Sequence, residues 1–153
     1  MTSGSKGRGL TEHHDRCVSL ILHDFPQRPD EIADWADYGD VAVVMIGDKA
    51  GHRAVTKNRI TWRQPINADV PWDDGLADLV RNLGGRERVA KLLSNVRPKA
   101  AWIRINLPSI GSPWQESAGL GRESIQLLAD LELEFDIAMF AYDDSQWTHR
   151  PKS

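Results

Sequence analysis

The chain has 153 residues, 41% hydrophobic and 27% charged, and its formal net charge is −3. These values are typical of a globular domain and exclude a disordered or fibrous chain, and the length suits one domain around one core. Its single cysteine, Cys17, excludes an intramolecular disulfide and therefore a secreted disulfide scaffold.

Both ends of the chain are polar. Residues 1–16 are rich in Gly, Ser and charge and lack the apolar middle of a signal peptide, so they are predicted to be a flexible tail. Residues 146–153 are predicted to be a second tail, which leaves 17–145 as a single domain. No apolar run approaches the roughly 20 residues that cross a bilayer, so we expect a cytoplasmic protein without a membrane partner.

The first half of the domain begins with an apolar, β-branched run. Residues 17–25 predict a strand, placed in the centre of a sheet. A short helix is expected to follow, with Pro29 in its first turn, acidic residues near its start and Gly39 at its end. Residues 41–48 are too apolar for an exposed strand and predict a second buried one.

Two stretches with helical spacing occupy the middle of the chain. The first has apolar residues at Leu76, Leu79, Val80 and Leu83, and the second at Val89, Leu92, Leu93 and Val96. Gly84 and Gly85 separate them. This break is equally compatible with two helices and with one kinked helix.

The last third predicts a strand, a helix and a strand. In the strand 100–107 the apolar side is formed by Ile103, Ile105 and Leu107. The next helix presents Ile125, Leu128 and Ala129 on one face, and the strand 133–142 is expected to bury Phe135, Ile137 and Met139. The order β-α-β-β-α-β-α-β predicts an α+β fold, a mostly antiparallel sheet with helices on one face.

Three segments resemble a bacterial family, domain of unknown function 4279. They are PDEI at 29–32, GDKAGHRAVTKNRITW at 47–62 and the segment from Glu116 to Tyr142, within a resemblance over roughly residues 17–143. The chain departs from the family pattern at Gly84-Gly85 and in NLPSI after the third strand. The resemblance implies a compact cytoplasmic domain and supplies no activity.

The segment 51–65, GHRAVTKNRITWRQP, is the strongest local charge signal. In an extended strand Lys57, Arg59 and Arg63 share one face, while Ile60 and Trp62 point to the core. We therefore expect a solvated edge hairpin, because charged residues protect sheet edges from aggregation. A docking edge for an acidic protein is the second interpretation, and nucleic acid is the third.

An acidic segment precedes the basic one. Its carboxylates, Asp30, Glu31, Asp34, Asp37 and Asp40, are expected to form a solvated helix face rather than a metal site. Such a face repels phosphate, which argues against nucleic acid. The two segments give the chain charge patches of opposite sign.

The sequence contains no complete catalytic or metal-binding motif. His13, His14 and Cys17 lie close together, but a structural zinc site needs four ligands and no second cluster exists. There is no G-x-S-x-G elbow, and a cysteine in an apolar strand is expected to be inert. We therefore predict a non-enzymatic domain without cofactor or metal.

Two of the six tryptophans, Trp72 and Trp114, each follow a proline in a loop, and they suit either a protein contact or a lid on the core. The leading hypothesis is a small protein-binding domain that is monomeric or weakly dimeric. An immunity or inhibitor protein is one kind of domain that fits this hypothesis. Its candidate partner-binding residues are Arg53, Lys57, Arg59, Arg63, Trp72 and Trp114. The alternative is an enzyme or small-molecule binder with a pocket between sheet and helices. A cluster of His23, Asp48 and His52 in a concave site would favour this alternative.

Overall fold

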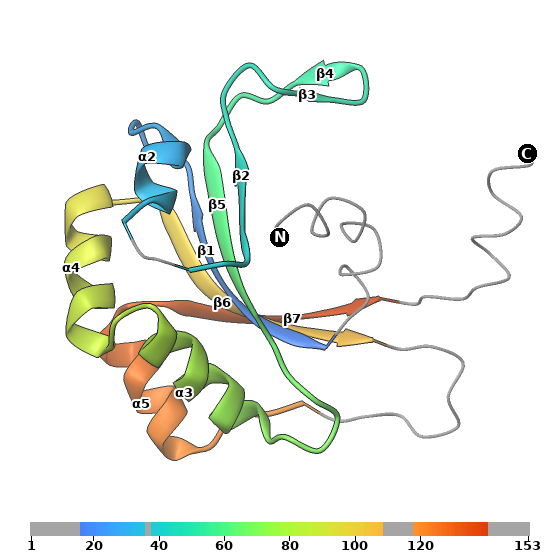
Figure 1. Ribbon diagram of the computed structural model, residues 1–153, viewed down its shortest axis with the longest axis vertical. Helices are drawn as coiled ribbons and strands as arrows, with labels where there is room; N and C mark the ends of the chain where they lie inside the picture. Colours follow the sequence, from blue (N-terminus) through green and yellow to red (C-terminus); the bar gives the residue numbers. More distant parts are fainter. Residues whose placement is uncertain (1–15, 36–37, 109–117, 141–153) are drawn as a thin grey trace, which may run out of the picture.

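The computed structural model describes residues 16–35, 38–108 and 118–140. In chain order the elements are β1 (Cys17–His23), α2 (Pro29–Ala33), β2 (Val41–Val44), β3 (Lys49–Ala50), β4 (Arg53–Ala54), β5 (Arg59–Pro65), α3 (Trp72–Asn82), α4 (Arg86–Val96), β6 (Ala100–Pro108), α5 (Arg122–Asp130) and β7 (Glu134–Phe140). Five strands form one sheet in the order β2-β5-β1-β6-β7, and β3 and β4 form a separate hairpin (Figure 1).

The α+β class is confirmed, and the sheet is mixed. β2, β5, β1 and β6 pair antiparallel, whereas β7 runs parallel to β6 because α5 connects the two as a crossover. The expected order of elements lacks the small β3–β4 hairpin, and the structure has two helices, α3 and α4, in the middle of the chain.

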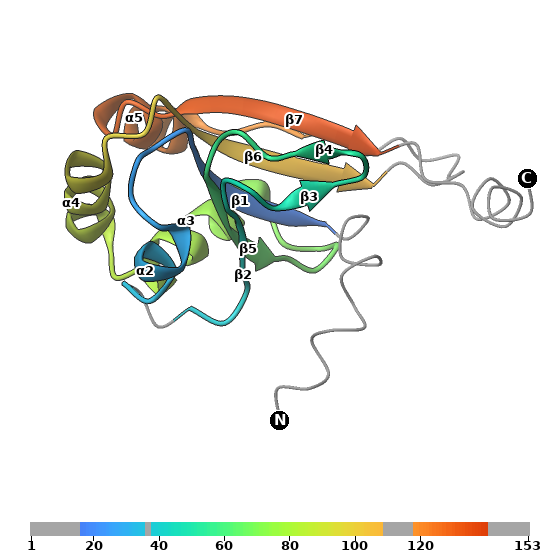
Figure 2. The ribbon, with the colours of Figure 1, turned by 90° about the horizontal axis from the view of Figure 1, so that it is seen from above.

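The central strand and the single helix layer follow the prediction. β1 is the third strand of five, and its residues Val18, Leu20 and Leu22 lie in the one apolar core with side chains from all four helices. Figures 1 and 2 both show these helices gathered on one side of the sheet. The apolar run of β1 is therefore buried because strands lie on both of its sides.

Two glycines separate α3 from α4. Gly84 and Gly85 have φ values of 103° and 99°, which side chains with a Cβ rarely adopt. The chain turns sharply there, and Arg86 starts a new helix. Of the two possibilities left open by the sequence, two separate helices is correct.

The prediction that 41–48 forms a buried strand was wrong. β2 ends at Val44, and among the described strands it lies at an edge and pairs only with β5. Val43, Val44 and Ile46 are all exposed. An apolar run shows that a strand has little polar surface, but it does not show how many strands flank it.

The prediction that the last strand buries its apolar row was also wrong. β7 forms the other edge, and Phe135, Ile137 and Met139 are 36%, 42% and 52% exposed. On α5 the buried side chains are Ser124 and Leu128, while Ile125 is exposed. Leu128 is buried as expected, but Ser124, which donates to Asp73 of α3 at 2.6 Å, is buried in place of Ile125.

Arg16, which precedes β1, packs on the loop before α3 and on the first residue of that helix. Arg16 donates to the Val70 carbonyl at 3.1 Å, and its guanidinium lies 4.2 Å from the centre of the Trp72 ring. Of the predicted tails at 1–16 and 146–153, residues 1–15 and 146–153 lie outside the described residues, as do the histidines of EHHDRC and Trp114. No helix in the described part of the chain is long and apolar enough to cross a membrane.

Candidate functional site

The structure divides the basic segment 51–65 into two parts. β5 lies between β2 and β1, so it is an interior strand, and the prediction of an edge hairpin was wrong for residues 59–65. Ile60 and Trp62 are fully buried in the core, as predicted from their parity. Arg59 and Arg63 lie on the opposite face of the sheet because β5 alternates.

Only the first part of the segment projects from the domain. The hairpin of β3 and β4 extends from the ends of β2 and β5 on the side away from the helices (Figure 1), and we call residues 47–55 the arm. Backbone bonds between Gly47 and Val55, at 3.0 Å, and between Val55 and Asp48, at 2.7 Å, close its base. Arg53 is exposed on the arm, so it is separated from Arg59 and Arg63.

The sheet face opposite the helices carries most of the polar side chains of the strands. We call it the polar face. Its members, read from the register of the ladders, include Cys17, Ser19, Ile21, His23, Arg59, Thr61, Arg63, Trp102, Arg104, Asn106, Glu134 and Asp136, together with apolar residues such as Val44 beside Arg59. The buried residues of every described helix lie in the core on the other side. No described helix therefore covers the polar face.

Two ion pairs cross the middle of the polar face. Arg104 binds Asp136 with two hydrogen bonds of 2.9 Å, and Arg63 lies 3.0 Å from Asp40. Ser19 is paired in register with both arginines and is buried between them. The bidentate geometry fixes the guanidinium of Arg104, so this row of side chains is rigid.

Arg59 differs from these arginines. Its side chain is half-buried, and no hydrogen bond or ion pair joins it to any described residue. Burial lowers the pKa of its guanidinium, and the positive charge of Arg104 lowers that pKa further, while Asp136 acts in the opposite direction. A half-buried cation without an acceptor is costly, so this position favours an external anion.

Trp102 lies on the same face as Arg59. Its ring lies 6.2 Å from that of His23 and 5.6 Å from the Arg104 guanidinium, and its Nε1 atom is buried without a hydrogen-bond partner. Buried indole N–H groups are usually bonded, and Trp62 in the core has a second unpaired one. Because the Trp102 Nε1 atom is buried, Arg59 is the more accessible donor of the two on the polar face.

Cys17 lies at one end of the polar face and is buried. Asn106 donates to its sulfur at 2.8 Å, and the Ser19 hydroxyl lies 3.8 Å away. Burial raises the pKa of the Cys17 thiol, so the neutral thiol dominates near neutral pH. Burial and the raised pKa both disfavour the thiolate that a nucleophilic cysteine needs.

The remaining candidate residues are dispersed. Lys57 is exposed and lies 3.4 Å from Asp24. Trp72 is only 6% exposed, so of its two interpretations the lid on the core fits the structure, and a partner contact through this ring does not. His52 and Asp48 lie on the arm, whereas His23 packs near Trp102 on the sheet, so the polar cluster considered for an enzyme does not form.

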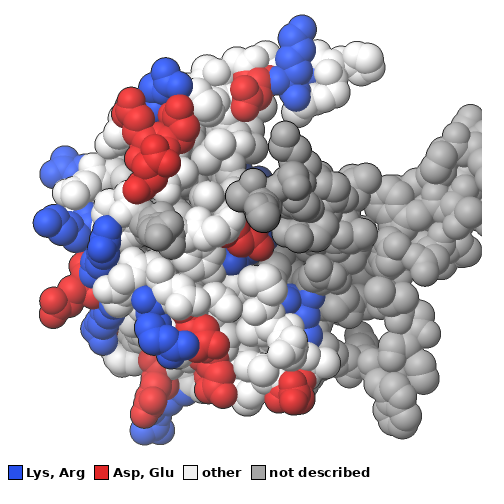
Figure 3. Space-filling view, viewed as in Figure 1, with Lys and Arg blue, Asp and Glu red and all other residues white. Residues whose placement is uncertain are grey.

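The expected charge patches are only partly separate. Figure 3 shows acidic side chains gathered at α2, with both signs interleaved over the rest of the face in view. The basic segment is balanced by acids, because Asp24 and Asp40 pair with two of its cations. No group of three or more His, Cys, Asp or Glu side chains in the described residues is placed to hold a metal ion.

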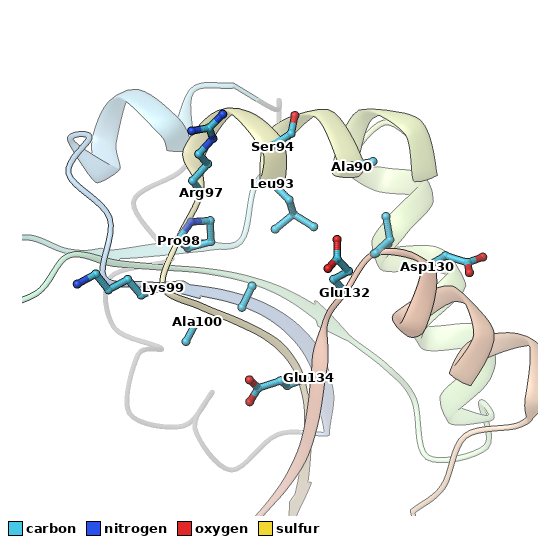
Figure 4. A pocket seen from close by; sticks show the side chains of 12 residues that line it. Ala90, Leu93, Ser94, Arg97, Pro98, Lys99, Ala100, Asp130, Glu132 and Glu134 are labelled. Atoms are coloured by element: carbon cyan, nitrogen blue, oxygen red, sulfur yellow. The ribbon is translucent and has the colours of Figure 1, made fainter.

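A groove of about 380 Å³ lies between α4 and the ends of β6 and β7. Its floor is apolar, formed by Leu93, Pro98, Ala100, Ala101 and Leu131, and its rims carry charged residues. In Figure 4 Leu93 and Glu132 point towards each other across the groove, whereas Arg97 and Lys99 point away from it. The polar groups therefore do not converge on one point in the groove.

Sequence reasoning placed Arg59 and Arg63 on one face but missed Trp102, Arg104 and Asp136. The alternation in 100–107 assigned Trp102 and Arg104 to the outward side, which was the available signal. Their link to Asp136 depends on the parallel register of β6 and β7, which joins residues 32 positions apart.

No protein-family model, curated protein or solved structure matches the chain. The resemblance to domain of unknown function 4279 stays a prediction.

Proposed function

We propose that the protein is a non-enzymatic protein-binding domain that receives an acidic side chain of its partner on the polar face. The observation that carries this proposal is the half-buried guanidinium of Arg59, which has no acceptor among the described residues. Arg104 pairs with Asp136 and Arg63 pairs with Asp40, which leaves the positive charge of Arg59 without an ion pair among the described residues. One carboxylate from a partner balances it.

The surroundings of Arg59 support a protein partner. Arginine and tryptophan are enriched at the centres of protein interfaces, and the polar face places Arg59, Trp102 and Arg104 close together on rigid strands. A guanidinium holds a carboxylate through two parallel bonds. The arm, which projects on the same side, extends the surface available to a partner (Figure 1).

The proposal includes a cytoplasmic location. It also includes an immunity or inhibitor role as the purpose of the protein binding. A protein that neutralises a toxin or an enzyme binds better when its contact surface is ordered before binding. The two hydrogen bonds between Arg104 and Asp136 order one part of the polar face. The buried Cys17 thiol supports the non-enzymatic part of the proposal, because its raised pKa leaves little thiolate to attack a substrate.

A peptide titration tests the proposal without knowledge of the partner. Hexaglutamate is added to the ¹⁵N-labelled protein, and the arginine Nε–H and tryptophan indole signals are followed by NMR at low salt. We expect the signals of Arg59 and Trp102 to shift, with an affinity that falls as salt is added. Hexalysine should leave both signals unchanged.

Matched variants identify the residue responsible. Arg59→Gln should weaken hexaglutamate binding about tenfold, since it removes a charge-assisted bond. Arg122→Gln, at an exposed position of α5, should bind like wild type. The proposal fails if Arg59→Gln binds as well as wild type, or if a mixed-sequence oligonucleotide shifts the Arg59 signal and hexaglutamate does not.

The groove beside α4 supports a second candidate, a small-molecule binder with its pocket between sheet and helices. Its volume of about 380 Å³ lies within the range of roughly 300–1,000 Å³ common for ligand pockets. A fragment screen that follows the methyl signals of Ala90 and Ala101 tests it. Fragments that shift these methyls without affecting Arg59 favour this candidate, and a screen in which no fragment shifts them contradicts it.

A further inference from the structure

One edge of the sheet has few of the features that usually protect an edge strand, because its charged residues, Glu134 and Asp136, lie on the face opposite its apolar row. β7 has seven residues, and among the described residues its backbone bonds only to β6. On the helix side it presents Phe135, Ile137 and Met139, which are 36%, 42% and 52% exposed. Natural edges are usually short, charged or interrupted by proline, and β7 has no lysine, arginine or proline.

We infer that β7 pairs antiparallel with the β7 of a second copy, so that the two sheets become continuous across a twofold axis at Ile137. This residue is the middle one of the seven, so pairing about it uses the whole strand. Phe135 then lies opposite Met139 of the other copy, and Ile137 lies opposite Ile137. The exposed apolar rows of the two copies meet on one side of the joined sheet.

Charge supports this register over those centred on Asp136 and Phe135, and a register centred on Ala138 is less favourable because it pairs only residues 136–140 of the strand. Pairing about Ile137 sets Asp136 opposite Ala138 and Glu134 opposite Phe140, so no acid faces an acid. Pairing about Asp136 sets two aspartates directly opposite, and pairing about Phe135 sets Glu134 opposite Asp136. Like charges in directly opposed positions destabilise an antiparallel ladder. If one strand instead slides by a single residue along the other, odd-numbered residues lie opposite even-numbered ones, and the apolar rows of the two copies lie on opposite faces of the joined sheet.

The other edge suits this role less well. β2 has four residues, so it supplies a shorter ladder. Three partly exposed side chains per copy make a contact below the roughly 1,200 Å² of a standard interface, so the dimer is weak. This inference is independent of the proposed acidic partner, since β7 meets the second copy through its outer edge.

Sedimentation equilibrium of the full chain, from about 10 µM to about 1 mM, tests the inference. Wild type should change from monomer to dimer over this range. Ile137→Lys should remain monomeric because it sets two lysines opposite each other, whereas Ile125→Lys, the same change at an exposed site on α5, should dimerise like wild type. An equimolar mixture of Ile137→Lys and Ile137→Glu chains should associate again, since residue 137 of one copy meets residue 137 of the other.

Amide exchange provides a measurement on the unmodified protein. The amides of 134–140 should become more protected as the concentration of wild type rises. A monomer at every concentration overturns the inference, and protection of these amides at low concentration then identifies a segment of the same chain on this edge. Equal loss of the dimer in Ile125→Lys, or failure of the mixed chains to associate, also overturns it.

Discussion

Ile105 and Ile137 are partners in the parallel ladder of β6 and β7, but Ile105 is fully buried and Ile137 is 42% exposed. Both side chains face the helix side of the sheet. The difference arises because β6 has a strand on each side, whereas β7 forms the edge. The position of a strand in the sheet, and not its pattern, therefore determines how much each isoleucine contributes to stability.

This pair gives a stability prediction. Ile105→Ala should lower the free energy of unfolding by about 2–5 kcal/mol, because it leaves a cavity in the core. Ile137→Ala should cost about 1 kcal/mol or less, since its side chain is already partly in water. Urea unfolding at low protein concentration, where β7 is unpaired, measures both. Equal costs would show that β7 is covered in solution.

The turn between α3 and α4 gives a second prediction. Gly84→Ala should cost about 1–3 kcal/mol, because a φ of 103° strains a residue with a Cβ and the added methyl group meets the Arg88 side chain. Gly39→Ala is the matched control, since no atom lies within 4 Å of its Cβ position. It should be neutral or stabilise by about 0.4–1 kcal/mol. In thermal melts we expect Gly84→Ala to lower the melting temperature and Gly39→Ala to leave it unchanged or raise it.

Local patterns predicted the elements but not their neighbours. The apolar run of β1, the spacing on α3 and α4 and the alternation of β6 each identified a segment, because burial of one face imposes the period of the element on the sequence. The apolar residues of β2 and β7 gave the same signal, and both strands are edges. Strand order depends on contacts between distant segments, which a local period does not record.

The candidate site shows the same limit. Parity placed Arg59 and Arg63 on one face of a strand, and this holds. The neighbours that define the site, Trp102, Arg104 and Asp136, come from β6 and β7, which are far away in the chain. These three residues could be assigned to the same site as Arg59 only after the register of β5, β1, β6 and β7 was known.

Tyr38 gives a prediction on pH. Its hydroxyl donates to the Arg63 carbonyl at 2.7 Å and lies 2.8 Å from Gln64 Oε1. Burial raises its pKa, and the negative charge of Asp40 adds to the shift. Since the folded pKa lies above the unfolded value of about 10, this contribution to stability is complete below about pH 10 and is lost as the pH rises through that value towards the folded pKa.

The variant Tyr38→Phe isolates this effect. Near pH 8 it should cost about 1 kcal/mol of stability through the lost hydrogen bond. Between about pH 10 and pH 11.5 the deficit should shrink, because only wild type loses stability by ionising Tyr38. Denaturant unfolding of both proteins across this range measures the difference. A deficit that stays constant up to pH 11.5 would mean that Tyr38 ionises freely in the folded state.

Cys17 gives a test of the non-enzymatic assignment. The thiol is 2% exposed, and burial raises its pKa, so both access and the thiolate fraction are low. Native protein at pH 8 should react with a disulfide reagent at least about 100-fold more slowly than protein in urea, because labelling requires the strand to open. Cys17→Ser, in which no labelling occurs, controls for side reactions. Rapid labelling of the folded protein would identify Cys17 as an accessible thiolate, and a covalent reaction at the polar face would then replace simple binding as the better hypothesis.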